Sequence, residues 1–220
     1  MRPPINTLFI GKTHHYIARV ESTNDYMRSF LELSQEQVPE GLLVTTDEQT
    51  AGKGQGGKKW IAEPGSNLMV SILLKPVFLE PRHVFYLNKA VALAIHDTLA
   101  TETYGISIKW PNDMYFENKK LAGVLIENVL GGNRILQSIV GIGINVNQKL
   151  FDENLPNPVS LIQITGRETD LSQLLATLCS QIEKYYLQLR SHQFTTIDAL
   201  YHHYLLKHQE NGLANKKFLT

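Results

Sequence analysis

The sequence contains a single cysteine, Cys179, and no excess of charge of either sign. One cysteine excludes an intrachain disulfide and fits a reducing compartment. The 21 lysines and arginines balance 21 aspartates and glutamates, which argues against a general surface for nucleic acid, although a local basic patch remains compatible. The N-terminal part also lacks a long apolar run. The first apolar run, 5–10, is too short for a signal peptide or a membrane span. We therefore expect a cytoplasmic protein with no membrane partner.

The 220 residues suit one domain of ordinary size, and they contain no internal repeat or low-complexity tract. The pattern predicts an α+β fold with a mixed, mainly antiparallel sheet and helices packed on one side. Short hairpin connections favour the antiparallel pairing. The expected strands are 5–10, 16–20, 41–46, 67–74, 106–110, 114–116, 121–128 and 134–145. The expected helices are 26–33, 82–100, 171–189 and 194–208, and 151–166 is expected to be an irregular link.

A glycine-rich stretch follows the third predicted strand. Four glycines and three lysines fall within the eight residues 52–59, and Trp60 closes the stretch. Glycine lets the backbone approach a ligand closely, and backbone N–H groups beside ammonium groups form an anion pocket. The stretch predicts a loop that closes over a charged small molecule, and a mobile surface loop with solvated lysines is the alternative.

Two known phosphate-binding patterns nearly match this loop. The glycines at 52, 54 and 57 have the spacing of the dinucleotide fingerprint, but a turn and a strand follow them where that fingerprint opens a helix. A P-loop would need serine or threonine at position 59, which is lysine. Neither pattern is therefore assigned.

Glycines also interrupt the apolar strands near the middle of the chain. Gly123 begins one strand, and Gly141 and Gly143, two residues apart, share one face of another. Such glycines often mark the close approach of a ligand or another backbone. A flat apolar ligand could lie against this face, and a tight helix crossing is the alternative.

The motif Lys109-Trp110-Pro111-Asn112-Asp113 ends a strand, because proline cannot extend the hydrogen-bond ladder. Asn112 and Asp113 could hold a metal-bound water or an amine, or could form a plain turn. Together, a bare sheet face, a lysine at its edge and a cationic loop suit attack of a carboxylate on the α-phosphate of ATP.

The sequence resembles the biotin protein ligase family. The resemblance runs from 21–24 through the glycine loop, 109–113, 120–127 and 141–145 to 158–161, in the family's order, and so covers most of the chain. It implies the family's catalytic domain in 1–208, and in 209–220 the start of a small β-barrel domain that is truncated or missing. The monofunctional type, without a DNA-binding domain, is expected, and the resemblance leaves a homodimer open.

The resemblance also implies site residues. Lys120, Lys53 and Asp113 would be catalytic. ATP and Mg²⁺ are the implied cofactors, Asn112 and Asp113 would face Mg²⁺ or the incoming amine, and no other residue predicts a protein-held metal. The biotin contacts would come from Ser22, Thr23, Asn24, Gln49, Gly52, Lys53, Gly54, Gln55, Lys120, Gly123, Gly141 and Gly143. The nucleotide contacts would come from Lys53, Lys58, Trp60, Asn112, Lys120 and Asn145.

The implied activity is ATP-dependent ligation of biotin, through biotinyl-AMP, to a lysine of a biotin carboxyl carrier protein. The loop carries Gln55 and Gly56 where the family usually has arginine, so we expect the adenylate to leak more readily. A lipoate or octanoate ligase of the same fold and a non-catalytic biotin sensor are the alternatives. An octanoyl transferase would need a catalytic cysteine, and Cys179 falls on a predicted amphipathic helix.

Overall fold

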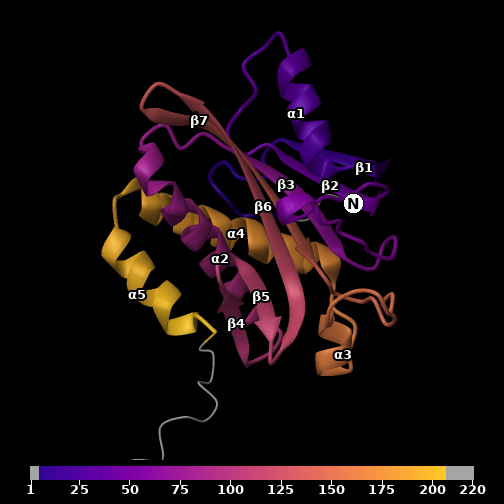
Figure 1. Ribbon diagram of the computed structural model, residues 1–220. Coiled ribbons are helices and arrows are strands. Elements are labelled where there is room, and N and C mark those ends of the chain that lie inside the picture. The colour runs from indigo at the N-terminus through magenta and orange to yellow at the C-terminus, as the bar shows by residue number, and fades with distance from the viewer. Residues whose placement is uncertain (1–4, 207–220) are drawn as a thin grey trace, which may run out of the picture.

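A computed structural model describes residues 5–206 of the chain (Figure 1). Its helices and strands, in chain order, are β1 (His14–Val20), α1 (Thr23–Leu33), β2 (Leu43–Gln49), β3 (Leu68–Leu74), α2 (Val84–Leu99), β4 (Ile106–Lys109), β5 (Asp113–Phe116), β6 (Lys119–Gly131), β7 (Arg134–Ile144), α3 (Leu161–Thr165), α4 (Leu171–Arg190) and α5 (Phe194–Tyr204). Short 3₁₀ turns span Gln55–Gly57 and Pro81–His83.

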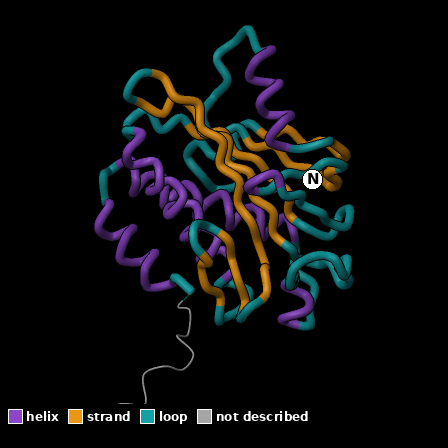
Figure 2. Tube along the Cα trace, viewed as in Figure 1, coloured by secondary structure: helices purple, strands orange, loops and turns teal. Residues whose placement is uncertain are grey.

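One seven-stranded sheet organises the molecule, in the order β1-β2-β3-β7-β6-β5-β4. Only β1 and β2 pair in parallel, and all other neighbours are antiparallel, which confirms the predicted mixed, mainly antiparallel sheet. The long hairpin of β6 and β7 forms its centre, as the orange strands of Figure 2 show. The strands that carry the expected site residues therefore lie next to one another.

Helices cover both faces of this sheet unequally. α2, α4 and α5 form a layer on one face, where their apolar sides and the sheet enclose the larger core (Figure 1). α1 packs on the opposite face, where Met27 lies with Leu73 and Ile139 in a smaller core. The expectation that all helices lie on one side therefore holds for three of them and is wrong for α1, which stands beside the glycine-bearing strands.

The N-terminal residues do not form the strand expected at 5–10. The backbone N–H groups of Leu8, Phe9 and Ile10 donate to the buried carboxylate of Glu183 on α4, at 2.6, 2.9 and 3.1 Å. A side chain from a distant helix thus satisfies donors that a strand would have used on a neighbour. The apolar run alone does not show that its N–H groups would pair with a side chain and not with a neighbouring strand.

Capping residues explain where the helices begin. Ser22 accepts a hydrogen bond from the N–H of Asp25 at the start of α1, and Asp170 accepts from the first turn of α4. The short α3 interrupts the link expected at 151–166. It begins at Ser160, whose N–H donates to Gln163 at 3.1 Å, and it ends at Gly166 in the left-handed region. This capping-box spacing was present in the sequence and was overlooked.

Helix α5 ends at Tyr204, earlier than predicted. Leu205 then forms a parallel bridge with Ile108, and the N–H of Leu206 donates to the carbonyl of Ile108 at 2.7 Å. The chain thus covers the outer edge of β4. The predicted end of this helix at 208 and the expected domain start at 209–220 lie outside the described residues. Within residues 5–206, no helix has the length and apolarity to cross a membrane.

Candidate active site

A pocket of about 660 Å³ lies over β6 and β7, on the face that carries α1. Its wall includes residues from the start of α1, the end of β2, the glycine loop, the 109–113 turn and the segment 151–158. These segments are far apart in sequence, and the sheet order brings them together. Most sequence motifs singled out above therefore meet at one cavity.

One end of the pocket is a fixed polar wall. Gln49, at the end of β2, accepts hydrogen bonds at Oε1 from the N–H of Thr23 at 2.8 Å and from its hydroxyl at 3.1 Å. Ser71 on β3 donates toward Thr23 Oγ1 and Asn24 Oδ1, at 2.8 and 2.6 Å. Because Thr23 occupies the Gln49 oxygen, the amide nitrogen is the end of Gln49 that stays available as a donor. This wall suits a ligand that presents a hydrogen-bond acceptor, such as a carbonyl oxygen.

A charged pair holds Asn24 in place. The amide nitrogen of Asn24 donates to Glu127 Oε2 on β6 at 2.7 Å, and the guanidinium of Arg28 pairs with the other oxygen of Glu127. Arg28 also contacts Asp25 at 2.7 Å. Burial raises the pKa of Asp25, but hydrogen bonds from Lys53 and Arg28 outweigh burial and leave that pKa below its usual value. Asp25 is therefore ionised at neutral pH, and its ion pairs lie behind the wall that Asn24 lines.

The three strand glycines do admit close neighbours, but these neighbours belong to the protein. A Cβ atom on Gly141 would lie 2.5 Å from Asn24 Oδ1, and one on Gly143 would lie 2.4 Å from the indole ring of Trp60. A Cβ on Gly123 would meet Lys120 and Trp60 at 3.1 and 3.2 Å. The expectation of a bare strip is thus corrected: α1 crosses at Gly141, and Trp60 covers the other two. A ligand would contact Asn24 and the indole as well as the backbone.

Lys120 marks the other end of the pocket. Its ammonium group lies 2.6 Å from Asp113 Oδ2. Its backbone is held on both sides, because its N–H donates to the carbonyl of Asn157 at 2.7 Å and its carbonyl accepts from the N–H of Val159 at 2.9 Å. The amide of Asn145 donates to the carbonyls of Lys120 and Val159, at 3.4 and 3.1 Å. Asn145 therefore braces the backbone that carries Lys120.

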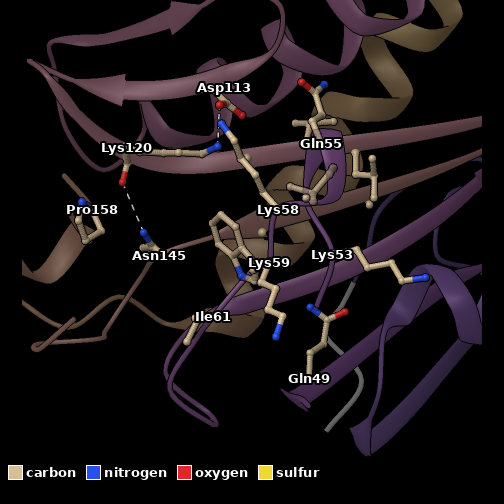
Figure 3. Close-up of a pocket in the computed structure, with 18 of the residues that line it drawn as sticks. Gln49, Lys53, Gln55, Lys58, Lys59, Ile61, Asp113, Lys120, Asn145 and Pro158 are labelled. Atoms are coloured by element: carbon tan, nitrogen blue, oxygen red, sulfur yellow. Dashed lines mark hydrogen bonds and ion pairs between the residues drawn. The ribbon is translucent and has the colours of Figure 1, made fainter. Parts of the chain in front are cut away.

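The glycine loop folds back on itself above this site. Lys53 and Lys59 form an antiparallel bridge, and the N–H of Gly54 donates to the carbonyl of Lys58 at 2.7 Å. The ammonium group of Lys53 pairs with Asp25 at 2.8 Å. In Figure 3, Lys58 and Lys120 extend toward Asp113, whereas Lys53 points away from it. Lys53 therefore fastens the loop to α1, and Lys58 is the loop lysine nearest to the Lys120 end.

The charge of the wall is unbalanced. Five lysines line the described pocket, at 53, 58, 59, 109 and 120, and Asp113 is the only carboxylate among its lining residues. Lys53 and Lys120 have acidic partners, but Lys58 and Lys59 have none within residues 5–206. An excess of cations in a partly enclosed site attracts anions such as carboxylates and phosphates.

The pocket brings together nearly all residues predicted for the site, with two exceptions. Gly52 is buried behind the wall, where a Cβ would lie 2.5 Å from the carbonyl oxygen of Trp60. Asn112 is fully buried, and its side chain contacts Gln55 and Asn88 rather than the cavity. The structure therefore does not place Asn112 at the surface that a nucleotide would touch.

Several residues that shape this wall are not among those that the sequence motifs predicted. Ser71 interrupts the otherwise apolar strand Leu68–Leu74, and a polar residue inside a buried strand signals a specific partner. Asp25 and Arg28 gave no signal beyond ordinary helix composition. Their role depends on Glu127, about a hundred residues further along the chain.

The sequence of this chain is similar to those of known proteins. The model of the biotin/lipoate A/B protein ligase family matches residues 16–145. The bifunctional ligase/repressor BirA of Bacillus subtilis is 34% identical over 181 residues, which are 80% of this chain and 55% of that protein. The biotin–[acetyl-CoA-carboxylase] ligase of Paracoccus denitrificans is 29% identical over 70% of this chain and 66% of its own length. This chain thus spans about half the length of the BirA relative.

A solved structure shows the same fold. The biotin protein ligase from Aquifex aeolicus, in complex with biotin and ATP, superposes with a TM-score of 0.76 at 30% identity, over 89% of this chain and 79% of that one. The biotin protein ligase of Leishmania major, at 20% identity and a TM-score of 0.69, shares the fold. The family model covers more than half of the residues, and this chain therefore belongs to the biotin/lipoate A/B protein ligase family.

Proposed function

We propose that this protein is an ATP-dependent ligase that joins biotin to a lysine of a biotin carboxyl carrier protein through biotinyl-AMP. The observation that carries the proposal is the two-ended pocket. Gln49 offers an amide donor at one end, and Lys120 with the loop lysines gathers positive charge at the other. Biotin has a ureido carbonyl at one end and a carboxylate at the other, which matches this order of donors and cations.

The first step would join the carboxylate to the nucleotide. A carboxylate oxygen attacks the α-phosphorus of ATP, the bond to the β-phosphate oxygen breaks, and pyrophosphate leaves. Negative charge grows on the phosphate oxygens in the transition state, where a fixed cation gives the largest stabilisation. Lys120 supplies that cation, because Asp113 and the flanking backbone bonds hold its position. Lys58 would add a second positive charge from the loop.

The second step would transfer the acyl group. The uncharged amine of the acceptor lysine attacks the acyl carbon, the bond to the AMP oxygen breaks, and AMP leaves with both electrons of that bond. The nitrogen releases one proton to solvent as the amide forms. Asp113 lines the pocket beside Lys120 and would orient the incoming amine. Lys53, paired with Asp25, would act by holding the loop over the adenylate.

Magnesium fits this site only as an ion held mainly by the nucleotide. Within residues 5–206, no group of three or more acidic, histidine or cysteine side chains could hold a metal. Mg²⁺ commonly binds through one or two carboxylates and the substrate phosphates, and Asp113 is the one carboxylate among the described residues that line the pocket. When bound, the ion would offset phosphate charge.

The polar wall and the cysteine bear on the rival functions. A lipoate or octanoate tail carries no ureido group, so it would leave the amide donor of the half-buried Gln49 without a partner, which costs free energy. Cys179 is fully buried in the larger core, and burial raises its pKa to about 12. It does not line the pocket, so it is no candidate for a thioester intermediate.

One assay separates these functions. The protein would be incubated with Mg-ATP and radiolabelled pyrophosphate, with biotin, lipoate or octanoate in parallel. The proposal predicts exchange of label into ATP with biotin only, and then a mass increase of one biotinyl group on the lysine of a carrier domain. Exchange with lipoate instead would favour the lipoate ligase, and biotin binding without exchange would favour a sensor.

A further inference from the structure

Asn112 behaves differently from its neighbours in the 109–113 turn. Trp110, Pro111 and Asp113 line the pocket, whereas Asn112 is fully buried and absent from the lining. Its amide nitrogen donates to Asn88 Oδ1 on α2 at 2.7 Å. The turn thus presents its other residues to the cavity and directs this one back toward the helical layer.

A chain of three amides runs through this point. Gln55, in the glycine loop, donates from Nε2 to Asn112 Oδ1 at 3.2 Å, and Asn112 in turn donates to Asn88. The side-chain oxygen of Asn112 accepts from Gln55, and its nitrogen donates to Asn88. Because Asn88 offers an acceptor to that nitrogen, it orients the Asn112 amide with its oxygen toward the loop. Asn88 itself is held on α2, whose apolar residues form much of the larger core.

The loop has few other attachments on this side. Within the described residues, the bridge between Lys53 and Lys59 and the turn at Gly54 are internal to the loop, and the Lys53–Asp25 pair ties it only to α1. That ion pair is partly exposed, and such pairs contribute little in water. Gln55 is the one side chain of residues 53–59 with a hydrogen bond to the 109–113 turn.

We propose that Asn88 is a positioning residue that, through Asn112, holds Gln55 and so keeps the glycine loop closed over the pocket. Residues 53–59 span the cavity between two polar anchors, α1 at Lys53 and α2 through the amide chain, and Trp60 packs on the strand glycines at the end of the loop. Loss of either anchor lets that side swing open. The consequence for retaining an acyl-adenylate rests on the function proposed above, whereas closure itself does not.

The direction of the hydrogen bonds predicts which substitutions matter. Asn88→Asp keeps an acceptor for Asn112, so it should leave the loop closed. Asn88→Leu has a similar size but no acceptor, so Asn112 can turn and Gln55 loses its fixed partner. Gln55→Glu removes the donor and should open the loop as much as Gln55→Ala does. Gln55 is exposed, so its variants should fold normally.

Loop opening can be measured on the ligand-free protein. Trypsin cuts after Lys53, Lys58 and Lys59, and hydrogen exchange of the peptide containing 50–61 reports the Gly54 and Trp60 amides. Loss of a single hydrogen bond of ordinary strength should make cleavage and exchange about three- to tenfold faster in Asn88→Leu, Gln55→Ala and Gln55→Glu. Asn88→Asp should match the unaltered protein.

A double variant tests whether the two residues act as one chain. Gln55→Ala combined with Asn88→Leu should open the loop no further than either change alone, because both break the same connection. Additive effects, equal opening in Asn88→Asp and Asn88→Leu, or no opening in Gln55→Ala would overturn the proposal. In a separate assay that follows labelled biotinyl-AMP leaving the protein, the open variants should release it about three- to tenfold faster. Altered cleavage without any exchange activity would support the anchor and refute the ligase.

Discussion

Lys120 is the residue on which the chemistry of this pocket depends most. Asp113 holds its ammonium group at one end of the cavity, and hydrogen bonds to residues 157 and 159 hold its backbone. The neighbouring Lys119 is exposed and does not line the pocket, since side chains alternate along a strand. The two lysines therefore form a matched pair for testing whether position, rather than charge alone, matters.

Replacing Lys120 by glutamine should lower the rate of biotin-dependent pyrophosphate exchange by about 10²–10³-fold, the range for losing one fixed group that stabilises transition-state charge. Lys119→Gln should leave the rate within about twofold, since an exposed charge outside the site contributes little. Steady-state exchange assays on both variants check this. Equal losses in the two would show that only the overall charge of the protein matters.

Gln49 offers a second test at the level of one atom. Its oxygen accepts two hydrogen bonds from Thr23, so only its nitrogen remains for a ligand. Gln49→Glu keeps the acceptor but replaces that donor by a negatively charged oxygen. The affinity for biotin should fall by about tenfold to a hundredfold, measured by isothermal titration calorimetry. Unchanged affinity in a variant with an unchanged melting temperature would place the ureido group elsewhere.

Among the elements, the central hairpin of β6 and β7 and the glycine loop depend on each other. Gly123 and Gly143 are paired across the hairpin, and the indole of Trp60 lies over both. Within residues 5–206, the Trp60 indole nitrogen is buried without a hydrogen-bond partner. An acceptor on a ligand could satisfy this donor. Trp60 thus links the loop to the floor of the site.

Gly143→Ala should push the indole away, because the new Cβ would lie 2.4 Å from the ring. Gly123→Ala, with its closest contact at 3.1 Å, should perturb the site less. Overpacking of this kind costs about 1–3 kcal/mol, and we expect weaker biotin binding in the same order. Adding Trp60→Leu should relieve the effect of Gly143→Ala on stability. Thermal unfolding and biotin titration check the series, and equal effects at both glycines would argue against indole contact.

At the scale of the whole molecule, a half-buried acid joins two helices of the larger layer. Asp97 on α2 accepts hydrogen bonds from Lys184 at 3.0 Å and Tyr185 at 2.8 Å on α4. Burial raises the pKa of Asp97, but bonds from His96, Lys184 and Tyr185 outweigh it and lower the pKa from 3.8 to about 2. The carboxylate is therefore more easily ionised in the folded protein than in the unfolded chain.

This shift predicts a dependence of stability on pH. A lowered folded-state pKa stabilises the fold above the unfolded value near 4, and the contribution disappears as the pH falls from about 4 to 2. Asp97→Asn should remove about 2 kcal/mol of stability at pH 7 and much less at pH 2. Urea unfolding of both proteins at pH 7, 4 and 2.5 measures the difference. A difference independent of pH would show that ionisation of Asp97 contributes nothing.

The sequence by itself determined most of the elements and most members of the site. Helical spacing and apolar runs located α2, α4 and the sheet strands, because periodicity reflects which face is buried. The motifs at 52–60, 109–113, 120–127 and 141–145 supplied most of the pocket wall, since glycine and lysine in such patterns serve few purposes other than close approach and anion binding.

Only the tertiary structure decided what these residues touch. Residues 5–10 do not form the expected strand, because Glu183, on a helix far along the chain, accepts hydrogen bonds from the N–H groups of residues 8–10. Asn112 turned out to be buried against Asn88, and the glycine strip was covered by Asn24 and Trp60. Local pattern reports backbone preference and burial, whereas partners that lie far apart in sequence are chosen by the folded geometry, which no local window contains.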